Sequence, residues 1–311
     1  MTASEIITTI NPPSEKNTAA VIVTFYPPAD MRYTLNVLTK QVDRIIIIDN
    51  TPALDRAQSD LKFNNALFIP VGRNLGVARA QNLGISLAIS MGYEWILLLD
   101  QDSKPASDFM KVMHRYFSSL TKQEKEQILM LAPNLCDESG GFFYTRVAGS
   151  KWMFRRVDCK GKQSVTDVLI AISSGSLIPV TSFQRIGFMD DNLFIDHVDN
   201  DFCLRGICKR LKIHVVCDAV VFHRLGNLRR VYSIGRLSIK SSFYTPFRRY
   251  FIYRNRMIIW KRYFRKVPAF VFHDIFSMLY DLLKIILVED LKRCKLQAAF
   301  EGLLSGLKMH V

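Results

Sequence analysis

The amino-acid sequence predicts an α/β fold, in which a mixed, mainly parallel sheet is flanked by helices and followed by a helical C-terminal extension. Apolar or β-branched runs at 19–26, 44–50, 66–70 and 95–100 alternate with segments of helical periodicity. Each run is apolar on both faces, which is typical of a parallel sheet that helices cover on both sides. Polar residues end most of these runs, and ligands bind at the carboxyl ends of strands in such sheets.

The chain can be divided by these signals and by its charge. A polar N-terminal tail (1–18) precedes an α/β domain (19–226). The first half of this domain (19–127) carries the regular alternation, and its second half (128–226) is less regular. A basic region with amphipathic helical periodicity (227–311) follows. With 311 residues, of which 49% are hydrophobic, the chain can bury a large core.

Helices are expected between the strands of the first half. In the segment 31–41, Tyr33, Val37 and Leu38 have helical spacing. The segment 72–92 begins at a Gly/Asn turn and then runs helical to a closing glycine.

In the second half, the element types are read from shorter runs. We expect strands at 128–135 and 166–179, a helix at 199–212 and a pair of strands at 213–223.

The six cysteines form no C-x-x-C pair, and several have apolar neighbours. We therefore expect reduced thiols rather than a disulfide framework. The N-terminus lacks a basic segment followed by an apolar run, so we expect no secretory signal. Together these features predict a cytoplasmic protein.

Basic charge is concentrated in the C-terminal third of the chain. The net charge is +14, and the stretch 229–266 holds 12 basic residues and no acidic one, interleaved with aromatic residues. Such a stretch could bind single-stranded nucleic acid, form a solvated face, or meet an anionic membrane. We favour the membrane and expect no nucleic acid partner.

The following segment has polar residues on one helical stripe, at His273, Ser277, Asp281 and Lys284, and is otherwise apolar. It is too interrupted to cross a membrane. It fits an interfacial amphipathic helix, a helix packed on a partner subunit in a homo-oligomer, or a helix that covers the domain's own core.

The strongest chemical signal is the sequence WILLLDQDSKP, in which a buried strand runs into Asp100, Gln101 and Asp102. Side chains alternate along an extended chain, so the two carboxylates lie on the same side. Mg²⁺ takes oxygen ligands, commonly one or two carboxylates together with substrate phosphates. A turn would also use these residue types, but their position at the end of this strand favours a metal site.

Two other strand ends are polar, at Thr24/Tyr26 and at Asp49/Asn50. The segment GRNLGVARAQNLGI contributes Asn74, Gly76 and Asn82, and its helix N-terminus could hold a phosphate or ribose group. The segment is neither a G-x-G-x-x-G fingerprint nor a Walker A loop, so neither of those nucleotide sites is indicated.

Three further motifs lie in the second half. FIDHVDNDFCLR places Asp196, Asp199 and Asp201 before a helix, where one Asp would suffice as a cap. A carboxylate beside a bound substrate is also a natural general base. SSGSLIP, with Ser174 and Gly175 at a break in a strand, suggests a bulge or a close approach by a ligand.

His223 closes the last strand of the domain, in VVFHRLG. Imidazole is a possible ligand for Mn²⁺. On local sequence alone, a capping or core histidine is favoured.

Taken in order, these motifs resemble glycosyltransferase family 2, with the GT-A fold, and within it the bacterial rhamnosyltransferases of polysaccharide and O-antigen synthesis. The resemblance covers 19–226, and RRYFIYRNRMIIW (248–260) resembles the C-terminal segment of that branch. It implies a nucleotide-sugar half at 19–127 and an acceptor half at 128–226.

The resemblance also implies roles for individual residues. Asp100, Asp102 and His223 would hold Mg²⁺ or Mn²⁺ against the donor diphosphate, which replaces the local interpretation of the histidine. Asp199 would be the catalytic base, with Asp201 as the alternative because Val198 stands where the family has Glu. The nucleotide sugar would be contacted by Thr24, Tyr26, Asp49, Asn50, Asn74, Gly76, Asn82, Asp100 and Gln101, and a donor or acceptor sugar by Ser174 and Gly175.

The implied activity is inverting transfer of L-rhamnose from dTDP-β-L-rhamnose to a saccharide linked to a lipid diphosphate, at the cytoplasmic face of the cell membrane. The stretch 229–290 would meet the membrane. Another nucleotide sugar, such as UDP-galactose or UDP-N-acetylglucosamine, is an alternative on the same scaffold. A nucleic-acid-binding module is an alternative from another class, supported by charge alone.

Overall fold

The computed structural model describes residues 10–28, 30–55, 63–138, 141–223, 229–234 and 237–310. Within them one large sheet contains β1 (Thr18–Thr24), β2 (Arg44–Asp49), β3 (Ala66–Pro70), β4 (Trp95–Asp100), β5 (Ser103–Pro105), β6 (Ile128–Asp137), β7 (Arg146–Gly149), β8 (Phe154–Val157), β9 (Ser164–Val168), β10 (Leu177–Pro179) and β11 (Lys212–His223). A separate hairpin is formed by β12 (Arg229–Ile234) and β13 (Leu237–Ser242).

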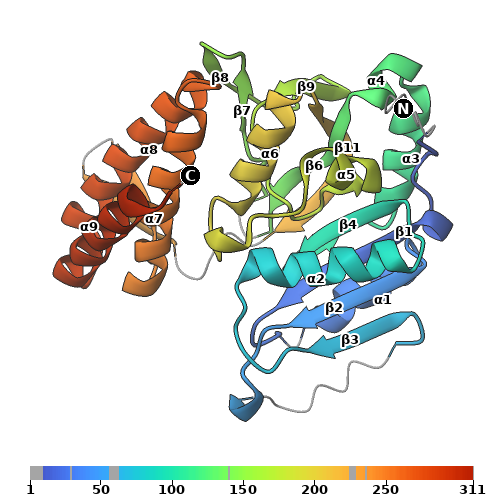
Figure 1. Cartoon of the computed structure of the whole chain (residues 1–311), viewed down its shortest axis with the longest axis horizontal. Helices are drawn as coiled ribbons and strands as arrows, with labels where there is room; N and C mark the ends of the chain where they lie inside the picture. Colours follow the sequence, from blue (N-terminus) through green and yellow to red (C-terminus); the bar gives the residue numbers. More distant parts are fainter. Residues whose placement is uncertain are drawn as a thin grey trace.

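Helices lie on both faces of the large sheet and at one side of the molecule (Figure 1). They are α1 (Met31–Leu38), α2 (Val77–Ser90), α3 (Phe109–Ser119), α4 (Lys122–Glu126), α5 (Val180–Ile186), α6 (Val198–Cys208), α7 (Pro246–Tyr263), α8 (Pro268–Leu287) and α9 (Lys292–Lys308). Short 3₁₀ turns are η1 (Glu15–Asn17), η2 (Ala53–Asp55) and η3 (Asp191–Leu193).

The strand order is β3-β2-β1-β4-β10-β6-β11-β9-β7-β8, and β5 pairs with β11. The first four strands are parallel, β10 runs antiparallel between β4 and β6, and β6 is parallel to β11. Alternate residues of β4 enter two different cores: Ile96 and Leu98 pack on the α2 side, and Leu97 and Leu99 on the side of α1 and α3. The predicted mixed sheet with helices on both faces is therefore confirmed.

Two elements of the second half differ from expectation. The segment 213–223 forms the single strand β11, with an irregular pairing to β6 between Val216 and Val220, rather than two strands. The expected strand 166–179 is divided into β9 and β10, because the chain turns through Gly175 at φ +80° between them.

The first described residues are packed against the domain. The indole of Trp95 donates to the carbonyl of Asn11 at 2.9 Å, and the Asn11 amide donates to Glu94. This part of the predicted N-terminal tail is therefore ordered by side chains at the start of β4.

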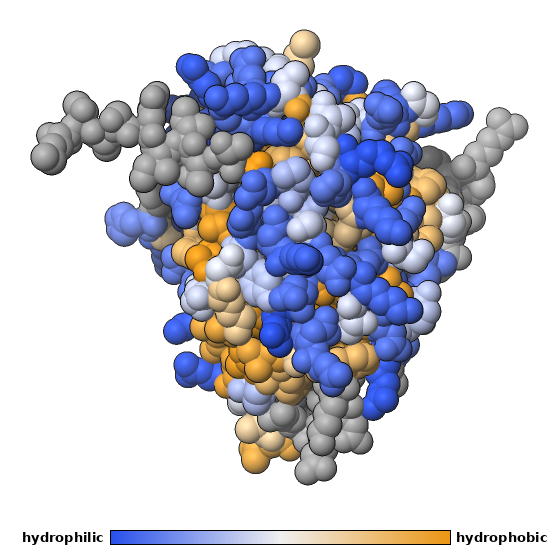
Figure 2. Space-filling view, turned by 90° about the vertical axis from the view of Figure 1, so that its right-hand side faces the viewer, coloured by the Kyte–Doolittle hydropathy of each residue, from blue (hydrophilic) through white to orange (hydrophobic). Residues whose placement is uncertain are grey.

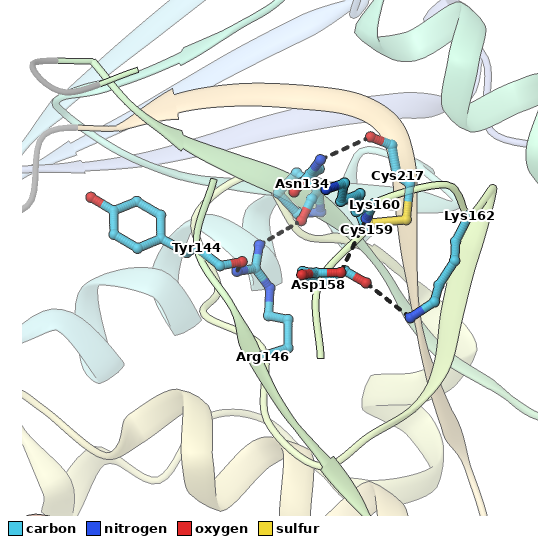
Figure 3. Close-up of a disulfide and its surroundings, with 9 residues drawn as sticks. Asn134, Tyr144, Arg146, Asp158, Cys159, Lys160, Lys162 and Cys217 are labelled. Atoms are coloured by element: carbon cyan, nitrogen blue, oxygen red, sulfur yellow. Dashed lines mark hydrogen bonds between the residues drawn. A yellow bond between two sulfur atoms is a disulfide. The ribbon is translucent and has the colours of Figure 1, made fainter. Parts of the chain in front are cut away.

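The prediction that all cysteines are reduced is wrong for one pair. Cys159 and Cys217 form a disulfide, which joins β11 to the loop between β8 and β9 (Figure 3). In the same loop, Lys162 donates to the carbonyl of Asp158 at 3.3 Å. The two cysteines are 58 residues apart, and a spacing this long gives no sequence signal for their pairing. Only the fold brings the loop with Cys159 next to Cys217 on β11.

The C-terminal helices are joined by buried ion pairs. The guanidinium of Arg249 on α7 is 1% exposed and contacts Asp281 on α8 and Glu289 just after it. Lys295 on α9 pairs with Glu289 at 3.0 Å. Removing one partner of such a pair would leave an uncompensated buried charge, so these contacts fix how the three helices associate.

Helix α8 is oriented opposite to the usual amphipathic arrangement. Asp274 and Asp281 face α7 and are buried, whereas the outward face is apolar and exposed. The exposed side chains on it are Phe272, Phe276, Leu279, Leu283, Ile286 and Leu287. By contrast, the opposite side of the molecule, at the right of Figure 1, is mainly hydrophilic (Figure 2). None of the described helices combines the length and apolar character that crossing a membrane requires.

Helix α7 holds the segment that leads into α6. Asn255 is fully buried, and its amide nitrogen donates to the carbonyls of Leu193, Ile195 and Asp196 at 2.7, 2.8 and 2.9 Å. Arg254 donates to the carbonyl of Leu193 at 3.2 Å. The C-terminal region is thus part of the structure that positions the loop before α6.

We predict that Asn255→Leu loosens this loop. The substitution keeps the branched shape of the side chain but removes its amide donor from three carbonyls, of which that of Leu193 keeps Arg254. We expect a cost of about 2–4 kcal/mol in the free energy of unfolding. Urea denaturation measures this loss, and amide hydrogen exchange should increase at 193–197. Ser305→Ala, which removes a hydrogen bond between α9 and Tyr250 on α7, is the control. Unchanged exchange at 193–197 in the Asn255 variant would contradict the assigned role.

Candidate active site

The carboxyl ends of β1, β2 and β4 lie side by side and collect the predicted polar residues. Thr24 is in register with Asp49, and Val23 with Asp100. The Thr24 hydroxyl donates to Asp49 Oδ1 at 2.9 Å. The parallel pairing of these strands therefore produces one polar edge from three separate parts of the sequence.

Asp100, Asp102 and His223 converge at this edge. One potential ligand atom from each lies within 4.8 Å of those of the other two. His223 arrives from β11 because that strand pairs antiparallel with β5, in which Ser103 is opposite His223. His223 Nδ1 is 3.4 Å from Asp102 Oδ1.

The chemistry of these three side chains fits a divalent cation. Burial raises the pKa of Asp100, the charge of Asp102 raises it further, and His223 and Arg248 oppose the change. Two carboxylates brought together in a half-buried position favour a cation between them, and oxygen ligands with one imidazole suit Mg²⁺ or Mn²⁺. The triad can hold such an ion.

A chain of hydroxyl groups supports the triad from behind. The backbone N–H of Asp100 donates to Ser174 Oγ at 3.0 Å, and Ser174 contacts Ser103 through their hydroxyls. Ser103 Oγ lies 3.0 Å from His223 Nδ1. Such outer contacts orient metal ligands. We did not single out Ser103 from the sequence, although it directly follows Asp102. Ser174, which was predicted to contact a sugar, is one of these linked hydroxyl groups.

Residues predicted to contact the nucleotide lie around Asp49. Its Oδ1 also accepts from the Thr51 hydroxyl at 2.7 Å, a residue not singled out from the sequence. The Gln101 side-chain oxygen accepts from the backbone N–H of Phe25 at 2.8 Å. Tyr26 is half exposed beside them, at a positive φ of 52°.

Hydrogen bonds from the side chains of Asn50 and Asn74 hold the loop that precedes α2. Asn50 Nδ2 donates to the carbonyl of Gly76 at 3.1 Å, and the Gly76 N–H donates to Asn74 Oδ1 at 2.9 Å. Gly76 has φ +81°, and a Cβ there would lie 2.6 Å from the carbonyl oxygen of Phe194. The glycine is therefore required by the close approach of the loop before α6.

Three groups predicted to contact a ligand have positions that contacts within the chain account for. The first amides of α2, expected to hold a phosphate or ribose, donate instead to the carbonyl of Phe194, from Val77 at 2.6 Å and from Ala78 at 3.4 Å. The Asn82 side chain, expected on the nucleotide, bonds both backbone groups of Met189 and the carboxylate of Asp191.

The third of these groups is Gly175, which was predicted to contact a sugar. A Cβ there would lie 2.7 Å from the Pro133 side chain and 2.9 Å from that of Val221. Packing between β6 and β11, together with the positive φ, therefore accounts for the glycine.

Asp199 lies in the first turn of α6 and is half-buried. Its pKa is raised to about 7, first by burial and then by the negative charge of Asp100, while hydrogen bonds from Ser173 oppose the shift and Asp196 adds to it. A carboxylate with a pKa near neutrality is suited to accept a proton from a substrate hydroxyl. The influence of Asp100 also shows that this carboxylate is close to the metal triad.

The alternative base, Asp201, is used differently. It is fully buried and bonded to Arg205 at 2.7 Å, Arg262 at 2.9 Å and the Tyr263 hydroxyl at 2.9 Å. A carboxylate already neutralised by two guanidinium groups is a poor proton acceptor. The structure therefore favours Asp199 for this chemistry.

Asp196 is also paired, and its partner comes from α7. Arg248 binds it through two hydrogen bonds, both 2.9 Å long. Burial lowers the pKa of this guanidinium, but the hydrogen bonds and charge of Asp196, with the charge of Asp100, raise it overall, so this cation also acts on the metal triad. Arg248 lies in the basic C-terminal stretch, where no local sequence signal predicts that it reaches the site.

No family model matches the chain. Among curated proteins, it is 27% identical over 271 residues to the dTDP-rhamnosyl transferase RfbF of Shigella flexneri, covering 86% of this chain and 88% of that protein. It is 26% identical over 246 residues to the galactofuranosyltransferase GlfT1 of Mycobacterium tuberculosis, covering 76% and 80% of the two chains.

Solved structures share the fold at low sequence identity. TarS 1–349 of S. aureus with UDP-GlcNAc superposes with a TM-score of 0.61 at 13% identity, over 93% of this chain and 81% of that one. GalNAc-T7 with UDP, GalNAc and Mn²⁺ gives 0.57 at 14% identity, over 92% and 55%. The resemblance drawn from the sequence is thus confirmed: sequence and fold together support a bacterial glycosyltransferase of the GT-A type.

Proposed function

We propose that the protein is a metal-dependent, inverting rhamnosyltransferase of cell-surface polysaccharide synthesis, such as that of O-antigen. The donor is dTDP-β-L-rhamnose, and the acceptor is a saccharide carried on a lipid diphosphate. The observation that carries the proposal is the half-buried Asp199 carboxylate, whose raised pKa reflects the charge of Asp100, together with the triad of Asp100, Asp102 and His223. The similarity to RfbF, along most of both chains, supports the choice of donor.

The reaction assigns one role to each group. Asp199 takes the proton of an acceptor hydroxyl while that oxygen attacks the anomeric carbon of the donor. The bond from this carbon to the dTDP oxygen breaks in the same step, which inverts the configuration and yields an α-L-rhamnoside. Asp100, Asp102 and His223 would hold Mg²⁺ or Mn²⁺, which stabilises the charge on the leaving diphosphate when bound.

Another donor on the same scaffold is the main alternative. GlfT1 is named as a galactofuranosyltransferase, and TarS binds UDP-GlcNAc, so proteins of this fold act on different sugars. Nucleic acid binding is disfavoured because the C-terminal guanidinium groups are largely paired within the chain, as in Arg248 with Asp196, Arg249 with Asp281 and Arg262 with Asp201.

Two features of the C-terminal helices support our proposal that the protein attaches to the membrane. A groove of about 1140 Å³ where α6, α7 and α8 meet is lined by Lys209, Arg265 and Lys266, all exposed. Phe264 also lines it and contacts Phe272, where the exposed apolar face of α8 begins. Cations beside an apolar ridge suit the headgroups and acyl chains of an anionic lipid surface. We therefore place the protein at the cytoplasmic face of the cell membrane.

The first prediction concerns the donor. Calorimetry with dTDP, UDP and GDP should show the tightest binding for dTDP, only with Mn²⁺ or Mg²⁺ and not with EDTA. Asp102→Ala should weaken it at least tenfold, because one carboxylate ligand is lost. Glu138→Gln, a change at an acidic residue that pairs with Lys104, is the control. Preference for UDP or GDP would reject rhamnose, and no binding at all would reject the site.

The second prediction concerns pH. Asp199 must be ionised to accept a proton, and its pKa of about 7 places the ionised form above neutrality. We expect kcat/KM to be level above about pH 7 and to fall about tenfold per pH unit below it. A cation at Asp100 would offset the negative charge that helps to raise the pKa of Asp199, so the acidic limb of the kcat/KM profile would move to lower pH. Asp199→Asn should abolish transfer, whereas Asp201→Asn should keep the limb and lose stability.

The third prediction concerns the membrane. The protein should sediment with vesicles that contain phosphatidylglycerol but not with pure phosphatidylcholine. Arg265→Gln with Lys266→Gln should weaken binding by about 2 kcal/mol, or roughly 30-fold, since each near-surface cation contributes about 1 kcal/mol. Lys122→Gln with Lys125→Gln on α4 is the charge-matched control. Equal weakening by both pairs, or no binding to either vesicle, would reject this orientation.

A further inference from the structure

The polar stripe of α8 faces a cavity that the reaction described above does not use. Ser277, Asp281 and Lys284, predicted from the sequence to share one helical stripe, line this cavity of about 380 Å³. Its opposite wall is the catalytic segment itself, through Asp196 and His197. Cavities of this size, near 300–1,000 Å³, hold small molecules in other proteins.

The cavity contains buried hydrogen-bond donors without acceptors. Arg256 is 8% exposed and Arg249 is 1% exposed. Within the described part of the chain, Arg256 Nε and Nη1 and Arg249 Nε make no hydrogen bond. Asp274 and Asp281 lie 3.4 and 4.0 Å from the Arg256 nitrogens, close enough to balance charge but without the geometry of a bond. Leaving such donors unsatisfied is costly, so acceptor oxygens are favoured near these guanidinium groups, although the three nitrogens themselves are closed to solvent.

The charges around the cavity select the class of ligand. The lining holds the carboxylates of Asp196 and Asp281 and the cations of Arg249, Arg256 and Lys284. Glu289 and Asp274, outside the lining, pair with Arg249 and Arg256. The cavity therefore offers both donors and acceptors and has little net charge to attract a phosphate. A neutral polyhydroxyl compound, each of whose hydroxyls donates and accepts, matches it. Tyr280, half exposed at the lining, adds an aromatic surface.

The position of the cavity assigns the ligand to one substrate. His197 and Asn200 line the cavity, and both lie within two residues of Asp199 in the sequence. Asp199 and the triad residues Asp100, Asp102 and His223 are not part of the lining. A ligand held here is therefore beside the segment that carries the base and separate from the metal ligands.

We propose that this cavity, between the catalytic segment and the inward face of α8, is the subsite for a neutral sugar unit of the acceptor. The inference rests on the proposed transferase function. It gives the C-terminal helices a direct part in acceptor choice, and it explains why the polar stripe of α8 faces inward.

The test uses a substitution that fills the cavity and measures two reactions of the donor, transfer to the acceptor and hydrolysis by water. Full-length protein is incubated with radiolabelled dTDP-rhamnose, with and without a glycolipid extract of the host bacterium. Label entering the glycolipid reports transfer, and label released without extract reports hydrolysis by water. In Ser277→Trp, transfer should fall roughly 100-fold, because a displaced acceptor loses its alignment. Hydrolysis and calorimetric dTDP binding should change less than about twofold.

Two further variants make the test specific. Lys111→Trp adds the same ring at an exposed position of α3, away from the cavity and from the apolar face of α8, and it should transfer at the wild-type rate. Lys284→Ala, which removes a donor without filling space, should raise KM for the extract about tenfold with little change in kcat. Wild-type transfer by Ser277→Trp would overturn the inference, as would parallel loss of hydrolysis and dTDP binding. If the wild-type protein itself binds no nucleotide and transfers nothing, the proposed function fails, and the inference fails with it.

Discussion

The active site depends on a short segment of backbone that is unfavourable by itself. Phe194, Asp196 and His197 all have positive φ, between 59° and 61°, and none is glycine. Such residues cost about 1–3 kcal/mol each and persist only where their surroundings determine them. This turn is what directs the chain into α6 with Asp199 in the first turn. The geometry of the base is thus stabilised by contacts elsewhere in the chain.

Those contacts come from two sides. The N-terminus of α2 donates to the carbonyl of Phe194, and Asn255 on α7 donates to three carbonyls of the same segment. Arg248 fixes the side chain of Asp196 with two further bonds. The N-terminal half and the C-terminal helices therefore meet at the catalytic segment. The predicted boundary near residue 226 thus separates parts of the chain that hold this segment together.

The sequence predicted the fold well and the site in part, for a physical reason. Strand ends are encoded locally: apolar runs ending in Asp49 or Asp100 indicate a polar edge, and parallel pairing brings the ends together. Side-chain contacts across the fold leave no such trace. Asn82 looked free to bind a ligand but is bonded to Met189. Likewise, a net charge summed along the chain cannot show that Arg249 and Arg262 are paired with carboxylates.

The orientation of α8 shows how this limit affects function. A polar stripe on an apolar helix normally indicates the solvent side. Here the basic groups of α7 are the stronger constraint, because a buried guanidinium requires carboxylates, and α8 provides Asp274 and Asp281. Once these face inward, the apolar residues must face outward. One set of ion pairs thus produces both the polar cavity beside the base and the exposed apolar face on the other side of α8. Acceptor binding and membrane attachment then become consequences of the same helix orientation, which is suited to an acceptor sugar carried on a lipid.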